Sequence, residues 1–336
     1  METHTVLLDH GAGGKLAHRL TTELMLPILD NPILAALHDG AVFDLPPGRL
    51  AFSTDSYTVT PLFFPGGSIG DLAVHGTVND VAMCGARPIF LSLALIIEEG
   101  LPLADLERIL RDAAAAAQRA EVAIVTGDTK VVPRGAVDRI FINTAGLGVI
   151  AEGVHIGGHR ARVGDRVLLS GTIGDHGMTI MTQRRELGLD LPLQSDSAPL
   201  NHMVRRMLAA SPRIGVLRDP TRGGLGTALC EIAEQSGVGI RIHEAAVPVR
   251  PAVAGACELL GFDPLYVANE GKLIAAVPPQ DAPAVLAAMR SDPLGRDACE
   301  IGTVVADRPG RVTLTTRIGG ERIVDMLAGE QLPRIC

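Results

Sequence analysis

Four aspartates stand beside turns or within polar segments, and their residue type points to phosphate and metal chemistry. Asp55 ends a β-type segment, Asp80 lies in VNDVA, Asp128 in TGDTK and Asp219 in RDPTRGG. Carboxylates that converge from separate elements suit Mg²⁺, a hard cation that takes oxygen ligands and usually meets a protein together with phosphates. Because a single aspartate is common in turns and at helix N-caps, the prediction depends on the four together.

A glycine-rich turn near the N-terminus, GAGGK, offers backbone N–H groups of the kind that bind phosphate oxygens. Gly11, Gly13 and Gly14 form the turn, and Lys15 follows it. The turn departs from the standard templates, because Leu16 stands where a Walker loop has Ser or Thr and where the dinucleotide fingerprint has its last glycine. Taken alone, the turn is better explained by a flexible link before a helix.

Two charged residues lie in otherwise apolar, strand-like surroundings. They are Lys130 in TGDTK and Glu270 in ANEGK. A charge held near a core tends to have a shifted pKa, which suits a general base or an electrostatic orienter, although a satisfied ion pair is the more common explanation. The histidines lack metal-type spacing such as HxxxH, so we assign no ligand role to His10, His75 or His176.

The segment from residue 66 to residue 88 has helical periodicity and is closed by Gly85, so it is predicted to be one long helix. Asp71, His75 and Asn79 are spaced i, i+4 and i+8 along it and therefore share one stripe. Asp80 lies about 100° further round. A polar stripe of this kind indicates a role other than packing.

Strand-type and helix-type segments alternate along the chain. The first half has strands in RLAFSTDSYTV, PIFLSLALII, VAIVTGDTKVV and RIFINTAGLGVI, with helices at 15–29 and in LADLERILRDAAAAAQRA. The second half has strands in RVLLSG, GIRIHEAAVPV, KLIAAVPP and RVTLTTRI, with helices in DHGMTIMTQRREL, NHMVRRMLAA, TRGGLGTALCEIAEQSG and DAPAVLAAMRS. We therefore predict an arm at 1–40, domains at 41–155 and 156–325, and an untethered tail at 326–336.

The bulk properties fit a two-domain protein with a small-molecule partner. A chain of 336 residues exceeds what one core normally organises. Its formal charge of −8 and the lack of a basic stripe argue against nucleic acid. The longest apolar run is about half of the roughly 20 residues that a membrane helix needs. The opening METHTVLLDH is no secretory signal, so we expect no membrane partner and a cytoplasmic location.

The last residue is a cysteine, in the terminal segment LPRIC. The five cysteines are widely spread and form no CxxC pair, which favours reduced thiols. At Cys336 the α-carboxylate beside the thiol disfavours the thiolate, so another group must activate it. The last eight residues can reach roughly 25 Å, and Pro333 keeps them out of a helix. An idle exposed thiol is the simpler explanation of these facts alone.

Eight segments together carry a family resemblance: HGAGGK, STDS, GTVNDVAMCGARP, TGDTKVV, LSGTIGDHG, DPTRGGL, ANEGK and PRIC. With them the chain resembles the HypE family of hydrogenase maturation factors, which are carbamoyl dehydratases of the aminoimidazole ribonucleotide synthetase and selenophosphate synthetase superfamily. The terminal PRIC is the most specific of these segments. Ala12 stands where selenophosphate synthetase has its reactive cysteine or selenocysteine.

The resemblance implies a fold and a set of partners. The fold is α/β plus α+β, a two-domain aminoimidazole ribonucleotide synthetase-like fold in which the N-terminal domain forms a dimeric β-barrel and the C-terminal tail is flexible. By this resemblance, the carbamoyltransferase HypF is expected to place a carbamoyl group on Cys336, and this chain is expected to use ATP to dehydrate the S-carboxamide to a thiocyanate. The cyanide is then expected to pass to iron on the HypC–HypD scaffold for NiFe hydrogenase.

The resemblance also implies roles for the residues singled out above. The proposed Mg²⁺ and phosphate ligands are Asp55, Asp80, Asp128 and Asp219, with Asn79 beside them. Lys15 and the loop of Gly11, Gly13 and Gly14 would close over the nucleotide. Glu270 is the candidate base, and Lys130 would orient the carboxamide.

Two other functions stay open at this point. One is a related synthetase that phosphorylates a free substrate, which Cys336 and Ala12 disfavour. The other is a non-catalytic carrier that binds ATP and passes a thiol-bound group between maturation partners.

Overall fold

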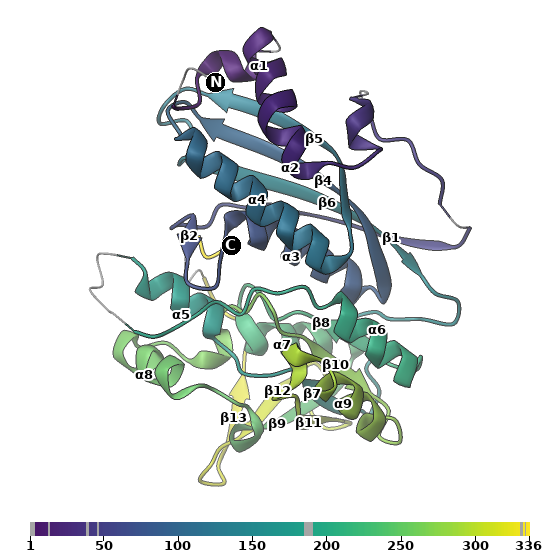
Figure 1. Ribbon diagram of the computed structural model, residues 1–336. Helices are drawn as coiled ribbons and strands as arrows, with labels where there is room; N and C mark the ends of the chain where they lie inside the picture. Colours follow the sequence, from purple (N-terminus) through teal and green to yellow (C-terminus); the bar gives the residue numbers. More distant parts are fainter. Residues whose placement is uncertain are drawn as a thin grey trace.

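The structure is a computed structural model that describes residues 4–12, 14–37, 40–45, 47–184, 191–329, 332 and 334–336. Gly13 and Pro333, which the sequence analysis singles out, lie outside the described residues. The described chain divides into an N-terminal part built around a four-stranded sheet and a C-terminal part built around a seven-stranded sheet, one above the other in Figure 1.

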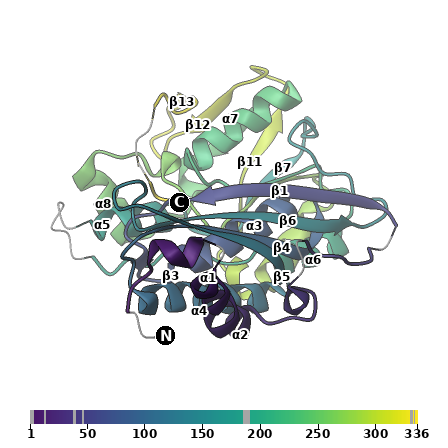
Figure 2. The same ribbon diagram turned by 90° about the horizontal axis from the view of Figure 1, so that it is seen from above.

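The N-terminal sheet has the order β1-β6-β4-β5, which Figure 2 shows from above. Its strands are β1 (Arg49–Tyr57), β4 (Ala86–Glu98), β5 (Ala123–Val132) and β6 (Ile140–Ile150). Only β4 and β5 pair in parallel, and the other two pairs are antiparallel. Helices α3 (Ile69–Met83) and α4 (Leu103–Ala120) follow the sequence predictions closely. A small hairpin, β2 (Phe63–Phe64) and β3 (Gly67–Ser68), leads into α3.

The start and end of α3 follow from its sequence. Ser68 is the N-cap, its Oγ accepts from the Gly70 N–H, and its own N–H donates to Asp71 at 3.0 Å, which makes a capping box. Gly85 ends the helix at a φ of +76°, a conformation that glycine adopts without strain. The chain then turns directly into β4.

The N-terminal arm runs beside β5. Its helical residues from 15 to 29 are continuous, as predicted, but the middle is a π-helical turn. The elements are η1 (Leu8–Gly11), α1 (Lys15–Arg19), η2 (Leu20–Met25), α2 (Leu26–Leu29) and η3 (Leu34–Ala36). The Asn31 side chain donates to the Ile124 carbonyl at 2.8 Å, which fastens the arm to the edge strand.

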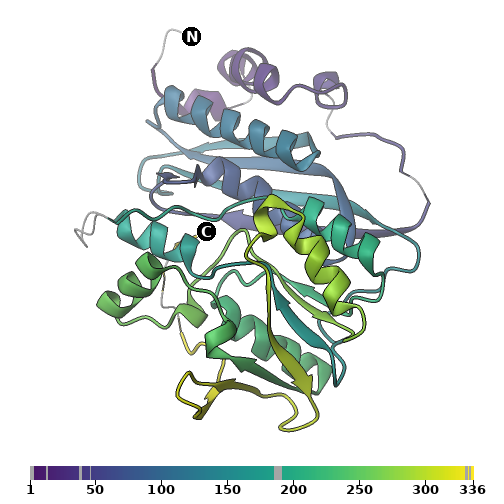
Figure 3. The ribbon, with the colours of Figure 1, turned by 60° about the horizontal axis from the view of Figure 1, so that its bottom comes forward.

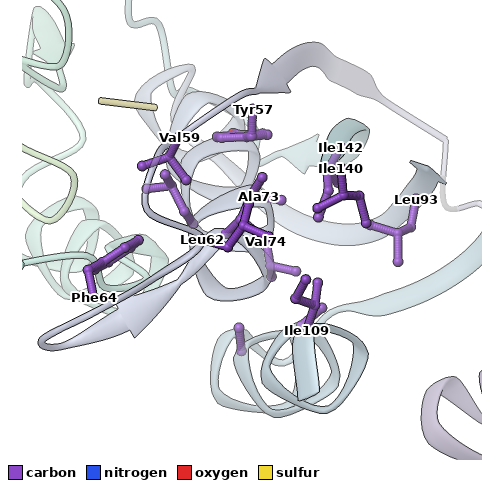
Figure 4. Close-up of a cluster of buried hydrophobic side chains, with 14 of the residues drawn as sticks. Tyr57, Val59, Leu62, Phe64, Ala73, Val74, Leu93, Ile109, Ile140 and Ile142 are labelled. Carbon is purple, nitrogen blue, oxygen red and sulfur yellow. The ribbon is translucent and has the colours of Figure 1, made fainter. Parts of the chain in front are cut away.

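Aliphatic residues fill the core of this half, as the scarcity of aromatic residues requires. Tyr57, Val74, Ile109 and Ile142 meet between the sheet and the two helices (Figure 4). Tyr57 is fully buried, and its hydroxyl lies 3.3 Å from Thr77 Oγ1. The buried tyrosine thus keeps a hydrogen-bond partner.

Gly70 allows α3 and α4 to pack closely, and this yields a stability prediction. A Cβ at Gly70 would lie 2.2 Å from the Ile109 carbonyl oxygen, whereas one at Gly255 in α8 (Pro251–Leu260) would meet nothing within 4 Å. Gly70→Ala is expected to lower the free energy of unfolding by about 2 kcal/mol. Gly255→Ala is expected to raise it by about 1 kcal/mol. Urea unfolding measures the change in unfolding free energy of both variants. Equal changes would contradict the close packing of α3 against α4 at Gly70.

The C-terminal sheet has the order β13-β12-β9-β11-β7-β10-β8. Its strands are β7 (Arg166–Leu169), β8 (Val216–Arg218), β9 (Gly239–His243), β10 (Ile274–Val277), β11 (Cys299–Val305), β12 (Val312–Thr315) and β13 (Glu321–Val324). Its further helices are α5 (Asp175–Thr182), α6 (Asn201–Ala210), α7 (Gly224–Ser236) and α9 (Ala282–Arg290). Alternation along β10 puts Ile274 in the core with α7 and Ala275 in the core with α6 and α9. Figure 3 shows α6 and α9 side by side.

Several elements of this half differ from the sequence predictions. The predicted strand GIRIHEAAVPV stops at His243, where a 3₁₀ turn (Glu244–Ala246) begins. The strands β8 and β11 and the helix α8 were not predicted, and neither was β13, which covers Glu321 and the first three residues of RIVDML. The N-terminal sheet is an open sheet in the described chain, so no barrel closes within one copy. No helix among the described residues is long and apolar enough to cross a membrane.

Candidate active site at the domain junction

Three of the four predicted aspartates come together where the two domains meet. Asp55 lies on β1, Asp80 on α3, and Asp219 directly follows β8. The Ser53 hydroxyl donates to Asp80 at 2.8 Å. Burial, followed by the nearby Asp80 charge, raises the pKa of Asp219 to about 7. Burial and Asp55 likewise raise the pKa of Asp80. These carboxylates therefore repel one another and lack a sufficient counter-charge.

Glu270 is the fourth carboxylate of this cluster, as its predicted role requires. It is 4% exposed and lies in the loop that leads into β10. Its backbone N–H donates to Asp196 at 3.0 Å, and its carbonyl accepts from Asn79 at 3.2 Å. Burial, followed by the charges of Asp219 and Asp196, raises the pKa of the Glu270 carboxyl well above its usual range.

The polar stripe on α3 holds the domain junction together. Asn79 donates to the Ala198 carbonyl at 3.0 Å and accepts from the Leu200 N–H at 2.7 Å. His75 contacts the same loop, with its Nδ1 3.0 Å from Ser197 Oγ. Burial lowers the pKa of His75 to about 3, so its ring is neutral. Asn79, predicted to bind the cofactor, has its amide engaged with backbone groups and acts here as a positioning residue.

A buried ion pair behind Glu270 was missed by the sequence analysis. Lys272 Nζ lies 3.0 Å from Asp196 Oδ2, and the two side chains are 10% and 4% exposed. Burial alone would raise the pKa of Asp196, but the Lys272 ammonium and hydrogen bonds outweigh it and lower the pKa. The Lys of ANEGK was visible in the sequence, whereas Asp196 belongs to no segment that we singled out.

Removing one partner of this pair should be far more harmful than removing both. Lys272→Met leaves the Asp196 carboxylate buried without its counter-charge and is expected to destabilise the fold by about 3 kcal/mol. In the double variant Lys272→Met/Asp196→Asn, the new amide oxygen still accepts from the Glu270 N–H, and most of the stability should return. Urea unfolding of both variants measures this, and a double variant as unstable as the single one would count against the pair.

The structure separates Asp128 and Lys130 from the cluster. Across the sheet, Asp55 pairs with Thr144, Thr144 pairs with Leu93, and Leu93 pairs with Gly127 on β5. Three strand spacings make about 14 Å. Asp128 follows Gly127 and so points to the opposite face of the sheet, as does Lys130. Within one copy, the four aspartates therefore do not form the single Mg²⁺ site that the sequence predicted.

The glycine-rich turn lies against the edge strand β5, which carries Asp128 and Lys130. A cavity of about 360 Å³ has His10, Gly11, Asp128 and Lys130 in its lining, together with apolar residues of the arm, β4 and α4. A Cβ at Gly11 would lie 2.6 Å from the Val131 N, so glycine is needed for this close approach. Gly14 and Lys15 are exposed.

The C-terminal tail is docked between the two domains (Figures 1 and 3). The Thr58 N–H and hydroxyl donate to a terminal oxygen of Cys336 at 3.0 and 3.3 Å. The Thr60 N–H donates to the Arg334 carbonyl at 3.3 Å. From the C-terminal domain, His176 Nε2 lies 2.6 Å from the Ile335 carbonyl oxygen. In this conformation the described end of the tail is held by hydrogen bonds to both domains, whereas the sequence predicted an untethered segment. The predicted mobility of the tail stays a prediction.

The docked position brings the terminal cysteine to the acidic cluster. Thr58, which holds Cys336, lies three residues beyond Asp55, which is about 10 Å along an extended chain. The terminal thiol, a buried carboxyl of raised pKa and three mutually repelling aspartates thus share one junction. A site of this composition can hold an anionic ligand only with a cation, and it can act on a group attached to the thiol.

Comparison with known proteins first defines the class. Two family models match the chain: AIR synthase related protein, N-terminal domain, at residues 37–150, and AIR synthase related protein, C-terminal domain, at residues 162–315. The first matched segment contains all four strands of the N-terminal sheet, and the second contains every strand of the C-terminal sheet except β13. The AIR synthase-like fold, of mixed α/β type, is thereby confirmed.

Relatives then give the family within this class. The carbamoyl dehydratase HypE of Azotobacter vinelandii is 57% identical over 332 residues, which cover 99% of this chain and 97% of that relative. A crystal structure of the hydrogenase maturation protein HypE in complex with ATP matches with a TM-score of 0.95 at 54% identity, covering 99% of this chain and all of that one. A HypE–HypF complex contains a chain that matches with a TM-score of 0.81 at 48% identity, with coverages of 94% and 100%.

The chain belongs to the HypE family of carbamoyl dehydratases. The predicted family, and with it the predicted function as a carbamoyl dehydratase of hydrogenase maturation, is confirmed. The roles assigned to individual residues stay predictions.

Proposed function

We propose that this chain uses ATP to dehydrate an S-carboxamide on Cys336 to a thiocyanate at the domain junction, and so supplies cyanide for the iron of NiFe hydrogenase. The observation that carries the proposal is the docking of Cys336 on Thr58, three residues along the chain from Asp55 of the carboxylate cluster. The ATP-bound HypE structure supports ATP as the co-substrate.

The residues of the junction fit Mg²⁺. Beside burial, the Asp55 charge raises the pKa of Asp80, and the charges of Asp80 and Asp55 raise that of Asp219; a divalent cation would relieve that repulsion. Among the described residues, no group of three or more His, Cys, Asp or Glu side chains converges tightly enough to hold an ion unaided. This suits Mg²⁺, which keeps several waters and is commonly bound by one or two carboxylates plus phosphates. Bound there, Mg²⁺ would neutralise charge on the transferred phosphoryl group.

The chemistry requires a leaving group and a base. Amide oxygen leaves poorly, and phosphorylation by ATP converts it into a phosphate leaving group. The nitrogen must lose its protons as that phosphate departs. Glu270 is the proposed base, because it is buried in the cluster and its backbone is fixed on both sides by Asp196 and Asn79. A cation near Asp219 would bring the raised pKa of Glu270 down and release its carboxylate.

A homodimer would give Asp128 and Lys130 their predicted roles. The sheet face to which they point carries exposed apolar side chains, with Leu50, Phe52 and Ile96 exposed by 47%, 71% and 41%. An apolar sheet face of this kind is suited to cover by a second copy. We propose that two N-terminal sheets pair through it as a barrel and bring these charged residues and the turn with Gly11 to the nucleotide.

We assign HypF as the partner that loads Cys336, which the HypE–HypF complex supports. The HypC–HypD scaffold is the proposed acceptor of cyanide, and the cytoplasm is the proposed location, consistent with five cysteines that form no disulfide among the described residues.

The raised pKa of Asp219 predicts a pH-dependent response to Mg²⁺. Between about pH 4 and pH 7 the folded chain holds a proton that the unfolded chain has lost, so stability falls as the pH rises through this window. At pH 8 the folded carboxylate is ionised and Mg²⁺ relieves the repulsion, whereas at pH 5 the ion must displace a proton. Millimolar MgCl₂ is expected to raise the melting temperature by about 2 °C at pH 8 and by less than half of that at pH 5.

Asp80→Asn provides the direct test of the cluster. It should abolish the response to Mg²⁺ at pH 8 and slow ATP-dependent dehydration of the loaded chain, while loading of Cys336 by HypF proceeds normally. The exposed Asp307→Asn is the matched control. If Asp80→Asn keeps the wild-type Mg²⁺ response and rate, the cluster is not the cation site.

A further inference from the structure

His176 is a fully buried histidine for which the proposed mechanism has no role. It is the second residue of α5, in the segment GDHG. Its Nε2 lies 2.6 Å from the Ile335 carbonyl oxygen, and its Nδ1 lies 2.8 Å from Ser195 Oγ. Burial lowers the pKa of His176, so the ring is neutral and carries one N–H. One of its two nitrogens therefore donates and the other accepts.

The neighbouring hydrogen bonds decide which nitrogen carries the proton. A carbonyl oxygen only accepts, so the Nε2–H must donate to Ile335. Nδ1 then accepts from the Ser195 hydroxyl, whose oxygen accepts in turn from the Ser197 N–H at 3.1 Å. Each donor and acceptor in this series of hydrogen bonds therefore has a partner of the right kind. The ring is thus held in the one tautomer that binds the tail.

The residue that follows His176 also packs closely against the tail. A Cβ on the next residue, Gly177, would lie 3.2 Å from the buried Leu332 side chain and 2.6 Å from Val267. Phe64 meets the His176 ring edge-on with centroids 5.7 Å apart. His176 therefore lies where the hairpin of one domain, the helix of the other and the tail come together.

Contacts from the N-terminal domain hold the tail from the other side. Arg334 Nη1 lies 2.6 Å from Asp138 Oδ2, and its Nε donates to the Thr58 carbonyl at 2.9 Å. The Arg334–Asp138 pair is half exposed, and such pairs contribute little. The bond from His176 is buried, and losing its donor would leave the Ile335 carbonyl unsatisfied in the interior. His176 is thus expected to hold the tail more strongly than the Arg334–Asp138 pair does.

We propose that His176 is a positioning residue for the reaction: it fixes the thiol-bearing tail at the domain junction by donating Nε2–H to the peptide carbonyl directly before Cys336. The bond is to backbone, so it forms equally with the free and with the carbamoylated thiol. This inference rests on the proposed function, since it takes the docked tail to be the reacting conformation.

Alkylation of the full-length chain without ATP tests the contact independently of catalysis. Iodoacetamide labelling is followed by peptide mass, with the exposed Cys84 as the internal reference. His176→Leu is expected to raise the ratio of Cys336 to Cys84 labelling about tenfold, because an unsatisfied buried carbonyl favours release of the tail. His176→Gln keeps an N–H donor and should restore much of the protection. The surface variant Asp138→Asn should raise the ratio by about twofold.

His75→Leu is the matched control. His75 is also a buried histidine bonded to a serine of the same loop, Ser197, but no hydrogen bond joins it to the described residues of the tail. It should leave the labelling ratio unchanged. In single-turnover dehydration of the loaded chain, His176→Leu should be about tenfold slower, with loading by HypF unaffected.

An unchanged labelling ratio in folded His176→Leu, or an equal rise in His75→Leu, would overturn the proposal. Should His176→Leu fail to fold, His176→Phe takes its place, because it keeps a ring against Phe64 but lacks the donor, and wild-type labelling in it would also reject the proposal. If the loaded wild-type chain never loses water with ATP, the proposed function fails, whereas the labelling ratio still reports on the His176 contact.

Discussion

Replacing Glu270 with glutamine is expected to slow ATP-dependent dehydration of the loaded chain by about 100-fold or more, the usual contribution of a general base. The amide cannot take a proton from the nitrogen of the substrate. The fold should survive, because the bonds to Asp196 and Asn79 are made by the Glu270 backbone. Moreover, glutamine has nearly the shape of the protonated carboxyl that the raised pKa favours in the ligand-free protein.

The measurement is a single-turnover rate on chain that is already loaded by HypF, with urea unfolding as the companion. Glu258→Gln, at an exposed position of α8, is the matched control and should behave as wild type. Loss of activity accompanied by an equal loss of stability would point to a structural role. A wild-type rate in Glu270→Gln would exclude it as the base.

Replacing Cys336 with serine is expected to abolish formation of the carbamoyl adduct, because the hydroxyl is far less nucleophilic than a thiolate. The tail should still dock, since its bonds to Thr58 and His176 involve the backbone of Cys336 and Ile335. ATP binding should therefore be unchanged. The adduct is measured by intact mass after incubation with HypF.

Cys84→Ser is the control for this variant, because Cys84 is an exposed thiol elsewhere in the chain. It should load fully. An adduct on Cys336→Ser, or a lost adduct on Cys84→Ser, would place the substrate on another residue.

The architecture could be predicted from the sequence wherever local signals were strong. The capping box at Ser68 and the break at Gly85 delimit α3, and alternation delimits β1 and β6. Strands of three or four residues, such as β8, carry too few residues for a periodic pattern. They form because the neighbouring strands of the sheet supply their partners.

The acidic site could be predicted only in part, for a topological reason. Residue types pointed to Asp55, Asp80, Asp128 and Asp219, but the distance between them depends on strand order and on which face each side chain takes. Spacing in the sequence does not contain the order β1-β6-β4-β5, which puts Asp128 three strands away and on the opposite face.

The docking site of the tail was the least predictable feature. His176 stands in GDHG without metal-type spacing, and its partner Ile335 lies 159 residues away. The clue in the sequence was the polar loop of serines that follows, because a buried histidine needs a partner for its second nitrogen. Only the meeting of both domains around the tail shows that Thr58, Asp138 and His176 belong to one site.

The most direct test of the central claim is the intact mass of the chain after loading by HypF, measured with and without ATP and Mg²⁺. The proposed mechanism predicts that the carbamoyl adduct on Cys336 loses the mass of one water, and that it does so only when ATP is present. An adduct that keeps its mass with ATP and is nevertheless passed on to HypC–HypD would contradict the mechanism and identify the chain as a carrier.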